Sequence, residues 1–277
     1  MSGGTGCEVK VLVKKSVDEL IVSLPKKERY DMDDLIDLVT VLRDQEKGCP
    51  WDKVQTHSTI KKDLLEEVYE VMEAIDFDSP EMMREELGDV LLQVIFHVVL
   101  EKERGSFVLE DVITELCQKL IIRHPHVFGN VQADTVDKVL SNWDSIKKDT
   151  KGQESFTDTL KSVPKNFPAL MRAQKLGKRA ARAGIDFEKC EEDGTELDLY
   201  SAITSTLGRV KQADLDKEDA SDELGKLLLL CSNLARRLNC DAEECLADSC
   251  NSFITKFEEL EKHSTNISEV SAEELYL

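Results

Sequence analysis

Two pairs of carboxylates lie on two predicted helices that follow one another in the chain. Within each pair the residues are three positions apart, a spacing that places both side chains on one face of a helix. Each pair interrupts apolar residues at helical spacing, so the sequence predicts carboxylates on faces that would otherwise be buried. The pairs are Glu67 and Glu70 in LLEEVYEVMEAI (64–75), and Glu86 and Asp89 in EELGDVLLQVIFH (85–97).

The segment between these helices is predicted to be a turn that brings the two pairs to the same level. Residues 76–80 read DFDSP, and Asp, Ser and Pro favour turns. Both pairs are equally far in sequence from the middle of this turn, each about two helical turns or roughly 11 Å away. An antiparallel hairpin therefore places the four carboxylates opposite one another.

Four neighbouring carboxylates need a positive partner, because like charges repel one another and burying them unpaired is costly. Mg²⁺ prefers oxygen ligands and commonly binds together with substrate phosphates, so we predict a metal site that also handles phosphate. The alternative is ordinary ion pairing on solvated helix faces, for which Lys61 and Lys62 are available. We favour that interpretation for Glu66, Glu73 and Glu85.

Composition predicts an all-α protein and limits its partners. Only six prolines occur in 277 residues, and helix-favouring residues are abundant. A net charge of −20 argues against binding to nucleic acid or to anionic membranes. The longest apolar run, residues 90–100, is too short to cross a bilayer. Eight cysteines without a CxxC pair indicate a reducing, cytoplasmic compartment.

The chain is predicted to hold two related helical repeats. ELGDVLLQ at 86–93 has a counterpart, ELGKLLLL, at 223–230. Asp89 corresponds to Lys226 there, so the polar stripe is lost while the apolar scaffold remains. A stripe needed only for folding should persist in both copies, which indicates that the first copy carries the chemistry.

These patterns divide the chain into five parts and predict three helices around the carboxylates. The parts are an N-terminal accessory segment or tail (1–30, with a short strand at 9–13), a first repeat (31–146), a linker (147–163), a second repeat (164–262) and a disordered tail (263–277). The helices are expected near 58–76, 80–103 and 108–123.

Over residues 32–262 the chain resembles the MazG family of nucleoside triphosphate pyrophosphohydrolases. The resemblance rests on several segments together, a combination far more specific than any single acidic motif. The segments are LRDQEKGCPWDKVQTH (42–57), LLEEVYEVMEAI (64–75), REELGDVLLQVIFH (84–97), KLIIRHPHVFGNV (119–131) and FPALMRAQKLGKRAARAGIDF (167–187).

The resemblance implies an all-α homodimer that uses Mg²⁺, with Mn²⁺ able to substitute, to hydrolyse nucleoside triphosphates to monophosphate and pyrophosphate. It implies that Glu67, Glu70, Glu86 and Asp89 are the metal ligands, and that Glu66 assists them or orients water. For the reaction itself, we expect Glu66 or Glu67 to take the proton of the attacking water. We expect a role in cleansing the nucleotide pool, with control of a signalling nucleotide as the alternative.

Five further residues are predicted to contact the substrate. Trp51 is placed to stack on the base, and its loop neighbour Gln55 is expected beside it. Lys119 and Arg123 match basic positions of the family and are candidates for triphosphate binding. Gln93 is expected to continue the pocket, one turn beyond Asp89. The alternatives are surface charge for the two basic residues and a core or interface role for Trp51.

His97 continues the polar stripe, and we interpret it as a core histidine. The second repeat departs from the family pattern, because its first acidic helix becomes SAITS (201–205) and its second carries Lys226. We therefore predict a noncatalytic second repeat. Two other functions stay open: a helical nucleotide sensor or scaffold that binds nucleotide without hydrolysis, and an acidic interaction protein.

Overall fold

The computed structural model describes residues 15–131, 155–186, 189–192 and 195–263, with short pieces between 134 and 146. The predicted strand at 9–13, most of the predicted linker and the C-terminal tail lie outside these residues. The chain forms two compact units, residues 1–134 and 135–277. Helices dominate both, which confirms the predicted all-α class. No helix in the described part is long and apolar enough to span a membrane.

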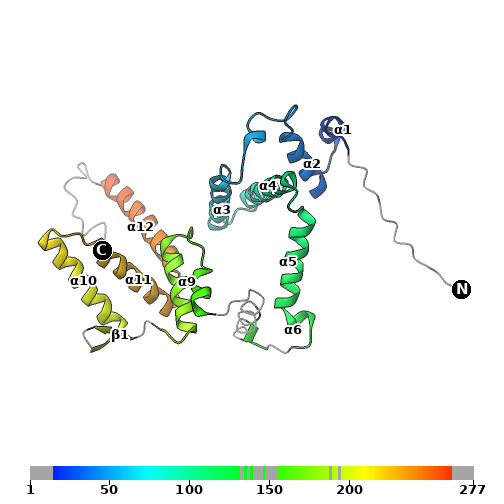
Figure 1. Ribbon diagram of the computed structural model, residues 1–277. Helices are drawn as coiled ribbons and strands as arrows, with labels where there is room; N and C mark the ends of the chain where they lie inside the picture. The colour runs from blue at the N-terminus through cyan, green and yellow to red at the C-terminus, as the bar shows by residue number, and fades with distance from the viewer. Residues whose placement is uncertain are drawn as a thin grey trace. The chain divides into compact units, whose positions relative to one another are not determined.

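The first unit is built around a long helical hairpin that Figure 1 shows as α3 beside α4. Ser79 caps the start of α4 through the backbone N–H of Met82, and Gly105 ends it in a left-handed conformation with φ of 74°. The helices of this unit are α1 (Val17–Ser23), η1 (Leu24–Lys26), α2 (Met32–Leu42), η2 (Asp52–Val54), α3 (Lys61–Asp76), α4 (Pro80–Arg104), α5 (Leu109–Arg123) and α6 (Pro125–Phe128).

The core of the first unit lies beside the C-terminal half of α4. The buried cluster consists of Val39, Ile60, Ile95, Phe96, Val98, Val99, Leu100 and Leu109. These residues come from α2, the start of α3, α4 and the start of α5, so the apolar stretch at 90–100 is a core segment. The N-terminal half of α4, which carries the acidic pair, lies outside this cluster and is free to hold polar groups.

Part of the predicted accessory segment packs on α2. Leu20 and Leu24 are buried, and the Lys27 ammonium contacts both carboxylate oxygens of Asp34. The Tyr30 hydroxyl donates a hydrogen bond to the Leu24 carbonyl over 3.0 Å. Residues 17–30 therefore belong to the first unit.

Arg43 attaches the loop between α2 and α3 to α4. Arg43 is only 5% exposed, and Arg is rarely buried without partners. It forms a bidentate pair with Glu103, at 2.7 and 2.9 Å, and donates to the carbonyls of Asp52 (2.7 Å) and Gln55 (3.2 Å). The Phe96 ring lies 5.2 Å below the guanidinium carbon. Arg43 thereby ties two backbone carbonyls of the loop to α4.

The second unit repeats the helical-hairpin arrangement with α10 packed on α11. Helix α9 packs on α8, α11 and α12. The elements are α8 (Phe156–Lys161), α9 (Ala169–Arg182), α10 (Leu199–Asp216), α11 (Ser221–Arg237) and α12 (Ala242–His263), with an antiparallel ribbon of β1 (Lys189–Glu192) and β2 (Thr195–Asp198) before α10. Helix α8 lies within the segment predicted to be a linker.

We predict that Arg43→Met destabilises the first unit by about 2–3 kcal/mol, because two loop carbonyls and Glu103 lose a charged donor. Urea unfolding followed by far-UV circular dichroism measures the change. Arg29→Met, at an exposed site, is the matched control and should leave stability unchanged. Equal stability of the two variants would contradict the anchoring role of Arg43.

Candidate active site

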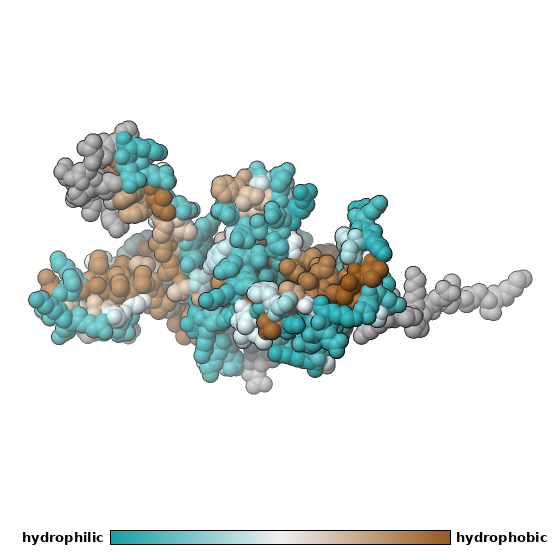
Figure 2. Space-filling view, turned by 90° about the horizontal axis from the view of Figure 1, so that it is seen from above, coloured by the Kyte–Doolittle hydropathy of each residue, from teal (hydrophilic) through white to brown (hydrophobic). Residues whose placement is uncertain are grey.

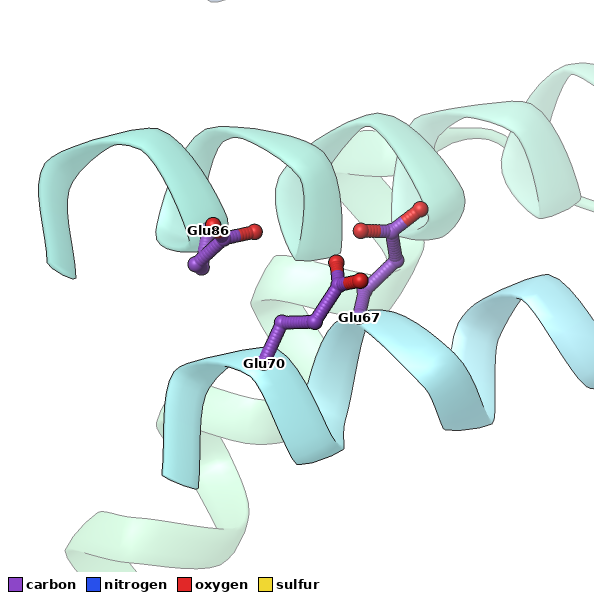
Figure 3. Close-up of side chains that lie close together, drawn as sticks. All are labelled: Glu67, Glu70 and Glu86. Carbon is purple, nitrogen blue, oxygen red and sulfur yellow. The ribbon is translucent and has the colours of Figure 1, made fainter. Parts of the chain in front are cut away.

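Three of the predicted carboxylates converge between α3 and α4. Glu67 and Glu70 project from α3 and Glu86 projects from α4 (Figure 3). One carboxylate oxygen from each lies within 4.8 Å of the others, close enough to share a cation. Glu67 and Glu86 are half-buried and Glu70 is exposed, so the cluster opens to solvent on one side.

The cluster is electrostatically strained without a cation. Burial, followed by the nearby charges of Asp89 and Glu70, raises the pKa of Glu67 above its usual value. Burial also raises the pKa of Glu86, with further contributions from Glu70, Glu85 and Asp89. Both shifts have the sign expected for crowded carboxylates. Within the described part of the chain, no ion pair involves Glu67, Glu70 or Glu86.

Gln93 borders the cluster from α4, one turn beyond Asp89. It is 9% exposed and hydrogen-bonds to the Glu67 carboxylate, an interaction that opposes the rise in the pKa of Glu67. Its side-chain carbonyl oxygen, Oε1, is buried and has no hydrogen-bond partner among the described residues. Leaving such a group unpaired is costly. The site therefore presents carboxylate oxygens and one unsatisfied carbonyl, a donor set that suits a hydrated hard cation.

The other predicted residues of α3, α4 and the loop before α3 lie outside the group of three carboxylates. Asp89 is half-buried and close enough to raise the pKa of both Glu67 and Glu86, but it is outside the group of three. Glu66 is exposed and also outside that group. Trp51 is 56% exposed, and its carbonyl accepts a hydrogen bond from the Gln55 amide over 3.0 Å.

The two basic residues lie on α5, which Figure 1 shows running away from the α3–α4 hairpin. Lys119 is exposed and lines a hollow of about 530 Å³ whose other walls include Phe107, Asp111 and Glu115. Arg123 is half-buried in the last turn of α5. Within one chain, the structure does not bring these two residues to the carboxylates.

Sequence reasoning missed a second polar group on α4. The interpretation of His97 as a satisfied core histidine holds for its hydrogen bonding but not for full burial. The ring is half-buried and pairs with His57, whose other nitrogen contacts Glu101. His97 and Glu101 continue the polar stripe of α4 at helical spacing, and this spacing could have indicated that the polar face extends beyond Gln93. The partner His57 is 40 positions away in a loop, so only the hairpin register could have indicated it.

Comparisons with known proteins place the carboxylate cluster within a known domain family. A family model for the MazG nucleotide pyrophosphohydrolase domain matches residues 55–128, which include the whole carboxylate cluster. A nucleoside triphosphate pyrophosphohydrolase of Escherichia coli strain K12 is 39% identical over 232 residues, covering 83% of this chain and 87% of the relative.

Two proteins from other organisms are also similar to this chain. The nucleoside triphosphate pyrophosphohydrolase/pyrophosphatase MazG of Thermotoga maritima is 39% identical over 230 residues, covering 83% of this chain and 85% of the relative. A nucleoside triphosphate pyrophosphohydrolase of Mycobacterium tuberculosis is 31% identical over 208 residues, covering 74% of this chain and 62% of the relative. Family match and coverage together confirm the resemblance, and the chain belongs to the MazG family of nucleotide pyrophosphohydrolases.

Proposed function

We propose that this chain, a nucleoside triphosphate pyrophosphohydrolase by family, cleaves its substrate to nucleoside monophosphate and pyrophosphate at the α3–α4 carboxylates. The observation that carries the proposal is the convergence of Glu67, Glu70 and Glu86 within 4.8 Å, without an ion-pair partner in the described structure. A negatively charged triphosphate would be repelled by this cluster unless a cation intervened.

Glu67, Glu70 and Glu86 would hold Mg²⁺, with Asp89 as the adjacent ligand, and Mn²⁺ would suit the same oxygen donors. The bound ion would neutralise triphosphate charge and make a coordinated water more acidic. Gln93 would orient a water or substrate donor through its unpaired Oε1. The fit rests on the donor set and on that unpaired buried oxygen.

Cleavage between the α- and β-phosphates requires water to attack the α-phosphorus while pyrophosphate leaves. Glu67 is the first candidate proton acceptor, because its carboxylate lies within the cluster where the attacking water would be held. Glu66 is the second candidate, although its exposed position outside the cluster leaves it less well placed in a single chain. Positioning and charge neutralisation supply most of the rate in reactions of this type.

Trp51 and Gln55 are proposed to contact the nucleotide base. Trp51 is exposed on a loop that Arg43 holds in place, which suits a stacking platform.

We propose nucleotide-pool cleansing as the physiological role. The free thiols among the described cysteines favour a reducing compartment such as the cytoplasm.

We also propose that two copies assemble into a homodimer. Large apolar side chains reach the surface of the first unit, and Figure 2 shows hydrophobic patches exposed on one face of the molecule. Packing such residues against a second copy would bury them. The same contact offers a way to bring Lys119 and Arg123 of one copy to the carboxylates of the other. The exposed residues include Leu65, Tyr69 and Met72 of α3 and Ile113, Leu116, Leu120 and Ile121 of α5.

The second unit is proposed to be noncatalytic, because a side-chain cation occupies the corresponding place. Glu223, the counterpart of Glu86, is paired with Arg209 and with Lys226, each at 2.8 Å. Arg209 also donates to the hydroxyls of Ser205 (3.1 Å) and Thr206 (2.9 Å). These partners lower the pKa of Glu223, whereas the pKa of Glu86 is raised. A site already neutralised in this way has no need of a metal ion.

We predict that Glu70→Gln lowers kcat at least about 100-fold and leaves helix content intact, because the amide removes one charge from the cation site. The assay separates the products of Mg²⁺-dependent turnover of a nucleoside triphosphate panel. Glu73→Gln, an exposed neighbour on α3, is the control and should keep full activity.

Three outcomes of this assay would count against parts of the proposal. Near-normal turnover by Glu70→Gln would overturn the site assignment. Diphosphate and phosphate as products would overturn the reaction assignment. Nucleotide-dependent thermal stabilisation without any product would indicate a sensor in place of an enzyme.

The rise in melting temperature caused by Mg²⁺ should shrink as the pH falls. A carboxyl whose folded pKa is raised stabilises the metal-free protein below its unfolded pKa and loses this contribution as the pH rises through the folded value. Glu67 and Glu86 behave in this way, so protons compete with Mg²⁺ from the raised pKa downward. Melting curves with Mg²⁺ and with chelator, recorded between about pH 4.5 and 8, test this. A shift independent of pH would contradict it.

Arg209→Met is predicted to lower the thermal stability of the second unit, because Glu223 loses a partner. Hydrolysis by the first unit should stay within about twofold of the parent, as expected for a distant site. Calorimetry and steady-state kinetics on the same preparation provide both values. A loss of turnover comparable to that of Glu70→Gln would mean that the second unit takes part in catalysis.

A further inference from the structure

His57 and His97 form a polar chain that the proposed reaction does not use. Their Nδ1 atoms lie 2.7 Å apart, and the two ring planes are within 9° of parallel, with centroids separated by 5.0 Å. On its other side, His57 Nε2 lies 2.6 Å from a Glu101 carboxylate oxygen. The same oxygen accepts a hydrogen bond from Arg104 over 2.8 Å. The chain therefore runs from His97 through His57 to Glu101.

The hydrogen-bond pattern permits at most one extra proton on the two histidines. Hydrogen bonds from Ser106 and His57 lower the pKa of Glu101, so its carboxylate is ionised and only accepts. His57 must then carry a proton on Nε2. With both rings neutral, His97 donates from Nδ1 to His57. With one added proton, His57 donates to His97. With two, an N–H on each ring points at the other, and the contact is lost.

The histidine pair closes one end of the loop that carries the proposed base contacts. His57 is two residues after Gln55, and His97 lies one helical turn beyond Gln93 on α4. The Arg43–Glu103 pair holds the same loop through backbone carbonyls, and Arg stays charged at all physiological pH values. The loop thus has one permanent attachment and one that depends on protonation.

We propose that His57 and His97 are positioning residues that form a pH-sensitive latch, holding the loop of Trp51 and Gln55 against α4 and releasing it when both rings are protonated. The inference rests on the proposed function only in assigning that loop to the substrate. The latch itself is a property of the ligand-free protein.

The surrounding charges agree with closure at neutral pH. Burial, followed by the nearby His57, lowers the pKa of His97 below its usual value. A group with a lowered folded pKa contributes stability above its unfolded pKa, about 6.5, and loses it as the pH falls through the folded value. The charged groups facing the pair are Glu101 and Arg104 of α4. Arg43, which follows the last residue of α2, is paired with Glu103. No ion pair in the described structure links His57 or His97 to α3.

Release of the loop should weaken substrate binding more than the chemical step, because the carboxylates lie on other turns of α3 and α4. If the closed state falls to about a tenth of the population, KM rises about tenfold. Over the same pH range kcat should change less. His97→Gln keeps a donor toward His57 without a second charge, so it should remain closed.

The test follows the fluorescence of Trp51 in ligand-free protein. Trp143→Phe leaves Trp51 as the remaining tryptophan in the chain. On titration from pH 8 to pH 5, we expect a transition with a midpoint below about 6.5. The transition should disappear in His97→Gln and persist in the control His126→Gln. Far-UV circular dichroism at each pH confirms that the protein remains folded.

Kinetics at the two ends of the titration complete the test. The parent should show the rise in KM and His97→Gln should not. No fluorescence transition, or the same transition in His97→Gln, would overturn the latch. A transition with unchanged KM would overturn its positioning role. Absence of hydrolysis at every pH would instead refute the proposed function, and the fluorescence result alone would then decide the latch.

Discussion

Repulsion among carboxylates between α3 and α4 is the constraint on which the active site depends. Glu67, Glu70 and Glu86 lie within 4.8 Å of one another, and Asp89 adds to their field. Like charges at this distance destabilise the fold unless protons or a cation compensate them. The apolar core at the other end of α4 supplies the stability that lets the hairpin carry this strain. We propose that this unmet charge is what draws a cation to the site.

The two units meet the same electrostatic demand in different ways. In the second unit, Arg209 and Lys226 neutralise Glu223, and the hydroxyls of Ser205 and Thr206 complete the contacts of Arg209. In the first unit the corresponding position is left open. A side-chain cation stabilises the hairpin permanently, but it leaves the carboxylates no free charge with which to bind a metal ion. A metal ion that exchanges with solvent could bind together with the substrate. The neutralised Glu223 and Glu86, which has no ion pair among the described residues, are therefore one clear electrostatic difference between the two units.

Much of this account could be predicted from sequence because it depends on local patterns. Helical spacing and the DFDSP turn were sufficient to place Glu67, Glu70 and Glu86 together. Contacts distant in sequence could not be read in this way. Arg43 resembles any surface arginine until Glu103 and the loop carbonyls surround it. His97 looked like a core histidine because its partner His57 lies in an irregular loop. Lys119 and Arg123 lie on α5, apart from the carboxylates of the same chain, and only the proposed dimer would bring them together.

Binding of Mn²⁺, followed by the loss of its free-ion electron paramagnetic resonance signal, tests the central claim most directly. The paired variants are Glu86→Gln in the first unit and Glu223→Gln at the equivalent position in the second. The account predicts saturable Mn²⁺ binding that is lost in Glu86→Gln and retained in Glu223→Gln, with Mg²⁺ competing in both the parent and the retained variant. Undiminished Mn²⁺ binding by Glu86→Gln would contradict the assignment of the α3–α4 carboxylates as the cation site.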